Sequence, residues 1–244
     1  WLPETGEGAW LRLDQCAEQC QGQPLTLVLP LEACSAFAVN LPPSKARRLR
    51  QALPYAVEEL LAEDVEQLHL ALGEQLADGR YRVLAIRHGL LAGWLQQLSD
   101  LGLPVTAIYC DADLLPHDGR QLLFIGERGL LGGAQAERLV FDRARWPELA
   151  EHCAEVTQAY GVDDQGPAEL PIYQQVSDPY RLLAAGAANG LDMAQGEFAL
   201  RNDSNHWRRW RPLLIAGIAC LVLQYGFNLA QGWYLQGAAD QYAA

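Results

Sequence analysis

The sequence lacks the short motifs that mark the common nucleotide-binding and hydrolytic enzymes. It contains no GxxxxGK[ST] loop, no GxGxxG turn, no GxSxG nucleophile turn and no HExxH pair. No nucleophile motif accompanies the histidines, which are scattered along the chain at His69, His88, His117, His152 and His206. We therefore expect no catalytic residues of these classes, and each histidine to be structural or exposed.

Basic residues are also scarce. Lys and Arg total 18 against 30 Asp and Glu, so the formal net charge is -12. An acidic surface repels phosphates, which argues against nucleic acid as the main ligand. It suits a protein partner with a basic face, although acidity also serves solubility alone.

The six cysteines lack the CxxC and Cys/His spacings of structural metal sites. Cys16 and Cys20 could share one helical face, whereas the other cysteines are far apart in apolar surroundings. Reduced thiols of a cytoplasmic protein fit this usage. We expect neither a metal nor a cofactor.

Long apolar runs are absent except near the C-terminus, so no signal peptide is visible. Pro212 to Leu235 carries no charge and as a helix would be about 35 Å long, enough to span a bilayer. Aromatic and basic residues flank it, at Trp207, Arg208, Arg209, Trp210, Arg211 and Trp233. The arginines precede the run, so the positive-inside rule places the preceding residues in the cytoplasm. A buried core helix is the alternative.

Three polar amides, Gln224, Asn228 and Gln231, share one face of this expected anchor with Gly217 and Leu221. Such residues usually turn toward another helix. We expect this face to pack against a second copy or another membrane protein, unless Asn228 and Gln231 simply meet water at the far interface.

The first 200 residues alternate between strand and helix patterns. Strands are predicted over 8–13, within 25–41 as two runs (25–29 and 36–41), and over 65–72, 81–87, 105–110, 121–125, 129–132, 138–141 and 172–176. Helices are predicted over 14–23, 44–64, 88–101, 147–159 and 178–188. The strands around Asp78-Gly79 form a hairpin. The class is α/β, with two lobes.

The predicted helix 44–64 is amphipathic, with Ser44 as its N-cap. Pro54 should kink or split it. Basic residues precede Pro54 and acidic residues follow it, so each half would then suit its own helix dipole. The carboxylates Glu58, Glu59, Glu63, Asp64 and Glu66 form either a docking surface or merely a solvated face.

Two stretches resemble the L-protein family of type II secretion systems (GspL/EpsL/XcpY-like). These are LRQALPYAVEELLAEDVEQLH at residues 49–69 and LDMAQGEFA at residues 191–199, which precede an Arg/Trp-flanked anchor in the same order. The resemblance implies a cytoplasmic domain over 1–205 of the actin-like ATPase superfamily, without ATPase activity. It also implies a transmembrane helix within 207–235 and the start of a periplasmic region over 236–244. We expect the chain to be a fragment that lacks the family's periplasmic ferredoxin-like domain.

The family's partners are the secretion ATPase (GspE-like), the M protein (GspM-like) and the platform protein (GspF-like) of the bacterial inner membrane. The implied function is a homodimeric scaffold that docks the ATPase and couples it to pseudopilus assembly. The alternatives are a type IV pilus-like assembly scaffold and an actin-like ATPase with a degenerate nucleotide site.

Two segments are candidates for the phosphate loops of such a site. Asp111 to Asp113 lacks the Asp-x-Gly arrangement of actin-like phosphate loops. Gly126 to Gly133 contains glycines, but Glu127 would repel a phosphate and no hydroxyl residue follows. Gly126 and Gly129 are more simply interpreted as hairpin glycines.

Overall fold

The computed structural model describes residues 1–3, 6–20, 22–134, 136–153, 155–164, 166–167, 170 and 172–200. They belong to one compact unit, Trp1–Leu200. Its helices are α1 (Leu13–Cys20), α2 (Ala46–Val57), α3 (His88–Asp100), α4 (Trp146–Ala150) and α5 (Pro179–Ala185). Among the described residues, no helix has the length and apolar character needed to cross a bilayer.

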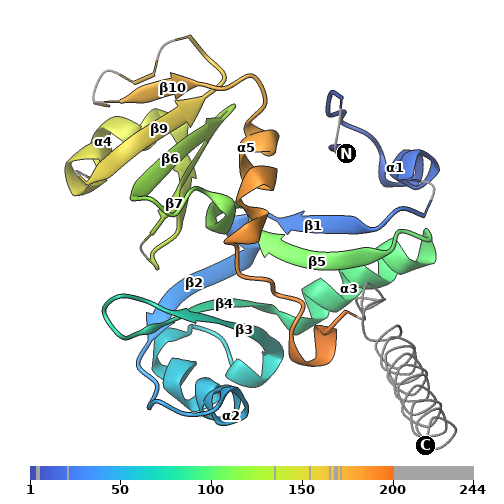
Figure 1. Ribbon diagram of the computed structural model, residues 1–244, viewed down its shortest axis with the longest axis vertical. Helices are drawn as coiled ribbons and strands as arrows, with labels where there is room; N and C mark the ends of the chain where they lie inside the picture. The colour runs from blue at the N-terminus through green and yellow to red at the C-terminus, as the bar shows by residue number, and fades with distance from the viewer. Residues whose placement is uncertain are drawn as a thin grey trace, which may run out of the picture. The chain divides into compact units, whose positions relative to one another are not determined.

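The largest core cluster lies around two parallel strands, β1 (Leu25–Leu29) and β5 (Val105–Cys110). Both are short apolar runs of the kind expected for strands covered on both faces. α3 packs below them, and α1 covers their far end through the buried Cys20. Figure 1 shows this layer in the middle of the unit.

A second sheet has the strand order β2-β4-β3, with β2 at Cys34–Val39, β3 at Leu68–Gln75 and β4 at Tyr81–Arg87. β3 and β4 form the predicted hairpin, whose turn contains Gly79 at φ 88°. α2 buries Leu49, Leu53 and Val57 against this sheet. The apolar face of α2 therefore fixes the helix against this sheet, and the opposite helix face lies on the side away from the sheet (Figure 1).

The third sheet has the order β10-β9-β6-β7-β8. Its strands are β6 (Arg120–Ile125), β7 (Arg128–Gly133), β8 (Leu139–Asp142), β9 (Val156–Gly161) and β10 (Tyr173–Gln175). Trp146 of α4 fills a separate core cluster with Phe124. Asp178 caps α5, as its position before Pro179 predicts, by accepting bonds from Tyr180 N and Arg181 N.

Two local predictions about strands and helices are wrong. Residues 8–12 form no strand: Trp10 is 88% exposed, and its ring meets Tyr180 edge-on instead of packing in a sheet. The helix predicted over 147–159 ends at Ala150. Val156 instead starts the strand β9, which pairs with β6 on one side and with β10 on the other.

α2 is also different from its prediction. It runs unbroken through Pro54, and its N-cap is Lys45, without a side-chain cap bond, rather than Ser44. Pro54 lies in the last turns, where a missing N–H removes only one internal bond. The helix predicted over 44–64 is wrong beyond Val57: the basic residues start α2, whereas the acidic Glu58 and Glu59 follow it in a separate 3-10 turn.

Candidate partner-docking surface

The five carboxylates predicted to bind a partner all lie on the surface where α2 leads into β3. Glu58 and Glu59 belong to a 3-10 turn, η2 (Glu58–Leu60), and Glu66 to another, η3 (Val65–Gln67). All five residues are exposed. The chain thus brings them to one region, because the turns keep residues 58–66 close to the end of α2.

Two of the five already have internal partners. Glu63 forms a bidentate ion pair with Arg87, with the closest approach 2.7 Å, and this bond lowers the pKa of the Glu63 carboxyl. Asp64 caps η3 by accepting a bond from Glu66 N. Within the part of the chain that the structure describes, Glu58, Glu59 and Glu66 form no ion pair and remain available to a partner.

A groove of about 410 Å³ lies beside this acidic region, between β2, β4 and the start of α3. Its apolar lining includes Leu61, Leu90 and Trp94, and its charged lining is Glu32, Glu63 and Arg87. Glu32 binds Arg128 through both oxygens, at 2.8 and 2.6 Å. The groove therefore combines apolar side chains with carboxylates that are already ion-paired to arginines.

The first candidate phosphate loop is occupied by internal bonds. Asp113 is fully buried and accepts bonds from Arg82, Arg138 and the Leu191 amide, the last at 2.7 Å. Burial lowers the pKa of Arg138, although Asp113 opposes this shift. A carboxylate with both oxygens engaged in this way holds sheets together and cannot also ligate Mg²⁺ without losing those bonds.

The neighbouring Asp111 also serves the fold. It accepts bonds from the amides of Leu31 and Ala112 and from Arg128. Burial raises the pKa of its carboxyl, and the bond from Arg128 only partly opposes this. Asp111 thereby ties the turn after β5 to the loop after β1.

The second candidate loop is a tight hairpin. Gly126 has φ 58° and, with exposed Glu127, makes the turn between β6 and β7. The prediction that Gly126 and Gly129 are hairpin glycines is therefore confirmed. Gly129 lies against the Phe141 ring, where no larger side chain fits.

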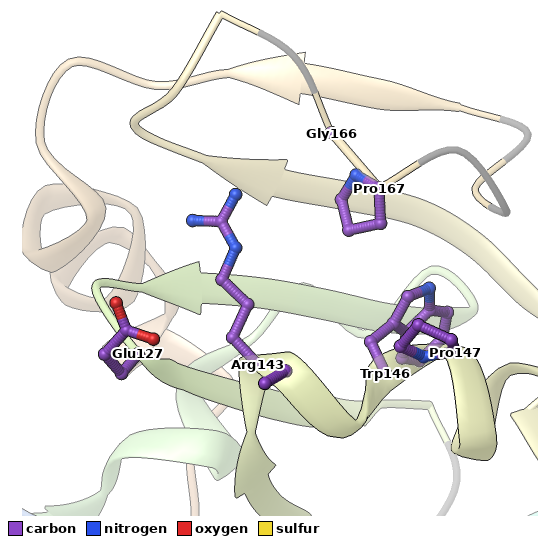
Figure 2. Close-up of a pocket in the computed structure, with 7 residues that line it drawn as sticks. Glu127, Arg143, Trp146, Pro147, Gly166 and Pro167 are labelled. Atoms are coloured by element: carbon purple, nitrogen blue, oxygen red, sulfur yellow. The ribbon is translucent and has the colours of Figure 1, made fainter.

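A second hollow of about 440 Å³ lies above α4, lined by Glu127, Arg143, Trp146 and Pro167 among others. Figure 2 shows the Arg143 side chain reaching from α4's side toward the β9–β10 side. Arg143 pairs with Asp163 and lies over the Phe124 ring. Its charge is thus already balanced, and no motif of the sequence predicts a ligand for this hollow.

Residues 189–198, which we name the C-terminal strap, cross from α5 to the start of α3 (Figure 1, orange). Met193 N donates to Ile108 O of β5. The Gln195 side-chain amide accepts a hydrogen bond from Leu72 N in β3 and donates one to Leu72 O. His69 lies 2.7 Å from Met193 O, and burial lowers its pKa. The strap therefore links the central strands to the β2-β4-β3 sheet.

Sequence reasoning missed the strap's partners and the buried arginines. Arg82 and Arg138 are far apart in the chain, and no local pattern relates them to Asp113. The only signal was the pair of acidic residues after β5. Among the described residues, no group of three or more His, Cys, Asp and Glu could hold a metal ion.

The remaining predicted site residues lie outside the described residues. These are the membrane flank (Trp207, Arg208, Arg209, Trp210, Arg211, Trp233) and the helix-packing face (Gly217, Leu221, Gln224, Asn228, Gln231). Both remain predictions.

Comparison with known proteins gives one consistent result. A sequence profile of the family described as Type II secretion system (T2SS), protein L matches residues 4–201. Type II secretion system protein L of Pseudomonas aeruginosa is 47% identical over 244 residues, which are 100% of this chain and 64% of that protein. The Klebsiella pneumoniae protein of the same name is 30% identical over 237 residues, covering 91% of this chain and 56% of that protein. The chain thus spans less than two thirds of both relatives.

A solved structure has a similar fold. It is the cytoplasmic domain of EpsL, an inner membrane component of the type II secretion system of Vibrio cholerae. The TM-score is 0.67 at 18% sequence identity, over 76% of this chain and 83% of that one. The likeness confirms the mixed α/β class.

Proposed function

The chain belongs to the type II secretion system protein L family, and from this premise we propose that it is a non-enzymatic scaffold of the bacterial inner membrane. Its unit Trp1–Leu200 would be an actin-like cytoplasmic domain that docks the secretion ATPase. The family membership carries the proposal. The description of EpsL as an inner membrane component supports the location.

The acidic surface supports a protein partner. The net charge of -12 and the exposed carboxylates Glu58, Glu59 and Glu66 suit an ATPase domain with a basic face. Complementary charges speed encounter and make association depend on salt. Glu63 and Asp64 would shape the edge of this surface, since their side chains are tied to Arg87 and to the η3 backbone.

The state of Asp111 and Asp113 supports a scaffold over an ATPase. Both carboxylates are buried and bonded to arginines. A nucleotide site of the actin-like kind needs carboxylates free to hold Mg²⁺ near backbone N–H groups. Breaking these ion pairs would be costly to the fold.

The expected anchor within 207–235 would join this domain to the membrane. Its face Gly217, Leu221, Gln224, Asn228 and Gln231 would pack against a second copy or the M protein, with the platform protein as a neighbour. Motion of the ATPase would reach the pseudopilus through this connection.

A binding titration tests the docking function. The unit Trp1–Leu200 is titrated with the N-terminal domain of the cognate secretion ATPase, and separately with ATP–Mg²⁺. We expect binding to the ATPase domain that weakens between low and physiological salt, and none to ATP. Binding to ATP alone would overturn the proposal in favour of an actin-like ATPase.

A charge-reversal pair locates the surface. Glu59→Lys/Glu66→Lys should weaken ATPase binding roughly tenfold, because two attractive charges become repulsive. Glu18→Lys/Glu148→Lys, at exposed positions on α1 and α4, changes the net charge equally and is the matched control. Equal effects of both variants would mean that the docking surface lies elsewhere.

A further inference from the structure

The outer face of α2 is exposed although it carries large side chains. Arg47, Gln51 and Tyr55 lie opposite the residues that the helix buries, and Tyr55 is 80% exposed. Figure 1 shows α2 on the outside of the β2-β4-β3 sheet. Within the described part of the chain, this exposure leaves the outer face of the helix uncovered.

The charged residues at the two ends of α2 interact unfavourably with the dipole of the helix. The first turn holds no acidic residue and begins with the basic run Lys45 to Arg50, whereas the last turn holds no basic residue and leads into Glu58 and Glu59. A helix dipole favours anions at its start and cations at its end. Both ends of α2 therefore carry charges of the unfavourable sign.

These charges also lack ion-pair partners within the described part of the unit. Arg47, Arg48 and Arg50 form no ion pair, and neither do Glu58 and Glu59. Other arginines of this acidic chain do find carboxylates, for example Arg87 and Arg128. Among the described residues, no ion pair within the chain therefore balances the charges of this face.

The charge pattern on the outer face of α2 is complementary to the same face of a second copy. Arg47, Gln51, Pro54 and Glu58 are spaced by four, three and four residues, so they form one stripe along the helix. If a second copy packs antiparallel across a two-fold axis at the level of residues 52 and 53, Arg47 faces Glu58 of the second copy, and the reverse pair forms by symmetry. Within one chain the two residues are about 16 Å apart and cannot pair.

We propose that α2 is a contact between two copies of this chain, packed antiparallel through the stripe Arg47–Gln51–Pro54–Glu58. This assigns a surface to the homodimer in the proposed function and rests on that part of it. Each copy then places carboxylates at the start of the other's helix and arginines at its end. The antiparallel arrangement therefore removes the unfavourable charge placement at both ends.

Tyr55 and Arg48 extend the contact on one side of the stripe. They are seven residues apart and lie on the same flank of α2, both exposed. A two-fold axis perpendicular to the helices brings the same flanks of both copies together. The Arg48 guanidinium can then lie on the Tyr55 ring of the second copy, which gives the exposed aromatic a partner.

The test uses cysteine crosslinking of the full 244-residue chain in membranes. Gln51→Cys places thiols next to the proposed axis, and Gln96→Cys on the exposed face of α3 is the matched control. We expect oxidation to join Gln51→Cys chains and not Gln96→Cys chains. The chain without an added cysteine gives the background from the native thiols.

Charge reversal then tests the pairing. Arg47→Glu and Glu58→Arg, each added singly, should lower Gln51→Cys crosslinking roughly tenfold, because both symmetric pairs become repulsive. Coexpression of the two single variants should restore crosslinking between unlike chains, since the glutamate introduced at position 47 of one copy then faces the arginine introduced at position 58 of the other. Unchanged melting curves by circular dichroism would show that these exposed substitutions leave the fold intact.

Two outcomes would overturn the proposal: crosslinking at Gln51→Cys no greater than at Gln96→Cys, or coexpression that fails to restore what the single variants lose. Failure of the scaffold proposal gives a different result. In that case the ATPase titration is negative for the unaltered chain, whereas the charge-dependent crosslink persists.

Discussion

At the scale of single residues, buried charge is the main feature of this domain. Asp113 has no exposed surface and is the common acceptor for Arg82 and Arg138, which are themselves buried. Glu74 gives Arg82 a second, half-exposed carboxylate. The arrangement holds only while every member keeps its partner, because an unpaired charge in the interior is strongly unfavourable.

Asp113→Asn should destabilise the unit by about 3 to 5 kcal/mol, since two buried guanidinium groups lose the carboxylate that they share. Urea unfolding of Trp1–Leu200 measures this change. Asp100→Asn, on the exposed face of α3, is the control and should have little effect. A loss for Asp113→Asn no larger than that of the control would mean that the arginines find other partners.

His69 should make stability depend on pH. Burial lowers its folded pKa below the unfolded value of about 6.5. The unfolded chain then binds more protons, so the stabilising contribution is present above that value and is lost as pH falls toward the folded pKa. We expect the free energy of unfolding to decrease from about pH 7 to about pH 5.

His69→Gln should flatten that decrease, because Gln does not titrate and its amide can still donate to Met193 O. Urea titrations at several pH values give the comparison. The exposed His152 offers the control substitution His152→Gln, which should keep the full pH dependence. A slope that persists in His69→Gln would assign the effect to another group.

At the scale of elements, two glycines differ in whether close packing requires them. At Gly186, where α5 ends, a Cβ would overlap the Leu114 carbonyl oxygen. At Gly93, inside α3, a Cβ meets nothing within 4 Å. One glycine is required by packing, and the other only lowers helix propensity.

Alanine substitution should therefore have opposite effects at the two sites. Gly186→Ala should destabilise the unit by about 1 to 3 kcal/mol through displacement of the backbone. Gly93→Ala should stabilise it by about 0.5 to 1 kcal/mol. Thermal unfolding of both variants checks the signs, and destabilisation by Gly93→Ala would contradict the placement of α3.

At the scale of the whole unit, the C-terminal strap (residues 189–198) joins sheets that are far apart in sequence. It contacts β5 at Ile108, β3 at Leu72 and the start of α3 at His88. Because the strap lies at the end of the unit, any load from the expected membrane anchor would enter through it. Its bonds to two sheets would spread that load across the domain.

Gln195→Ala should cost about 1 to 3 kcal/mol, since both backbone groups of Leu72 lose their partner in a partly buried place. Gln97→Ala, at an exposed position of α3, is the control. Hydrogen exchange should show faster exchange of the Leu72 amide in Gln195→Ala only. Equal protection in both variants would mean that the strap does not stabilise β3.

Local signals were sufficient for much of the fold. The β3–β4 hairpin around Gly79, the strand β5 and the helix α3 occur where alternation, turn residues and amphipathic spacing place them. The five carboxylates were also visible as a group, because they are close in sequence. The errors arose where segments distant in the chain determine the local structure. Val156 is in a strand because that strand, β9, pairs with β6 on one side and with β10 on the other.

The sequence by itself determined the α/β class, the acidic character, the likeness to protein L of type II secretion systems and most element positions, since these depend on composition and short-range patterns. Tertiary structure alone decided that Asp113 is a buried counter-charge rather than a phosphate-loop ligand. It also decided that Glu63 is ion-paired while Glu58 forms no ion pair among the described residues, and that α2 remains one helix through Pro54. Those outcomes depend on residues distant in the chain, which only folding brings together.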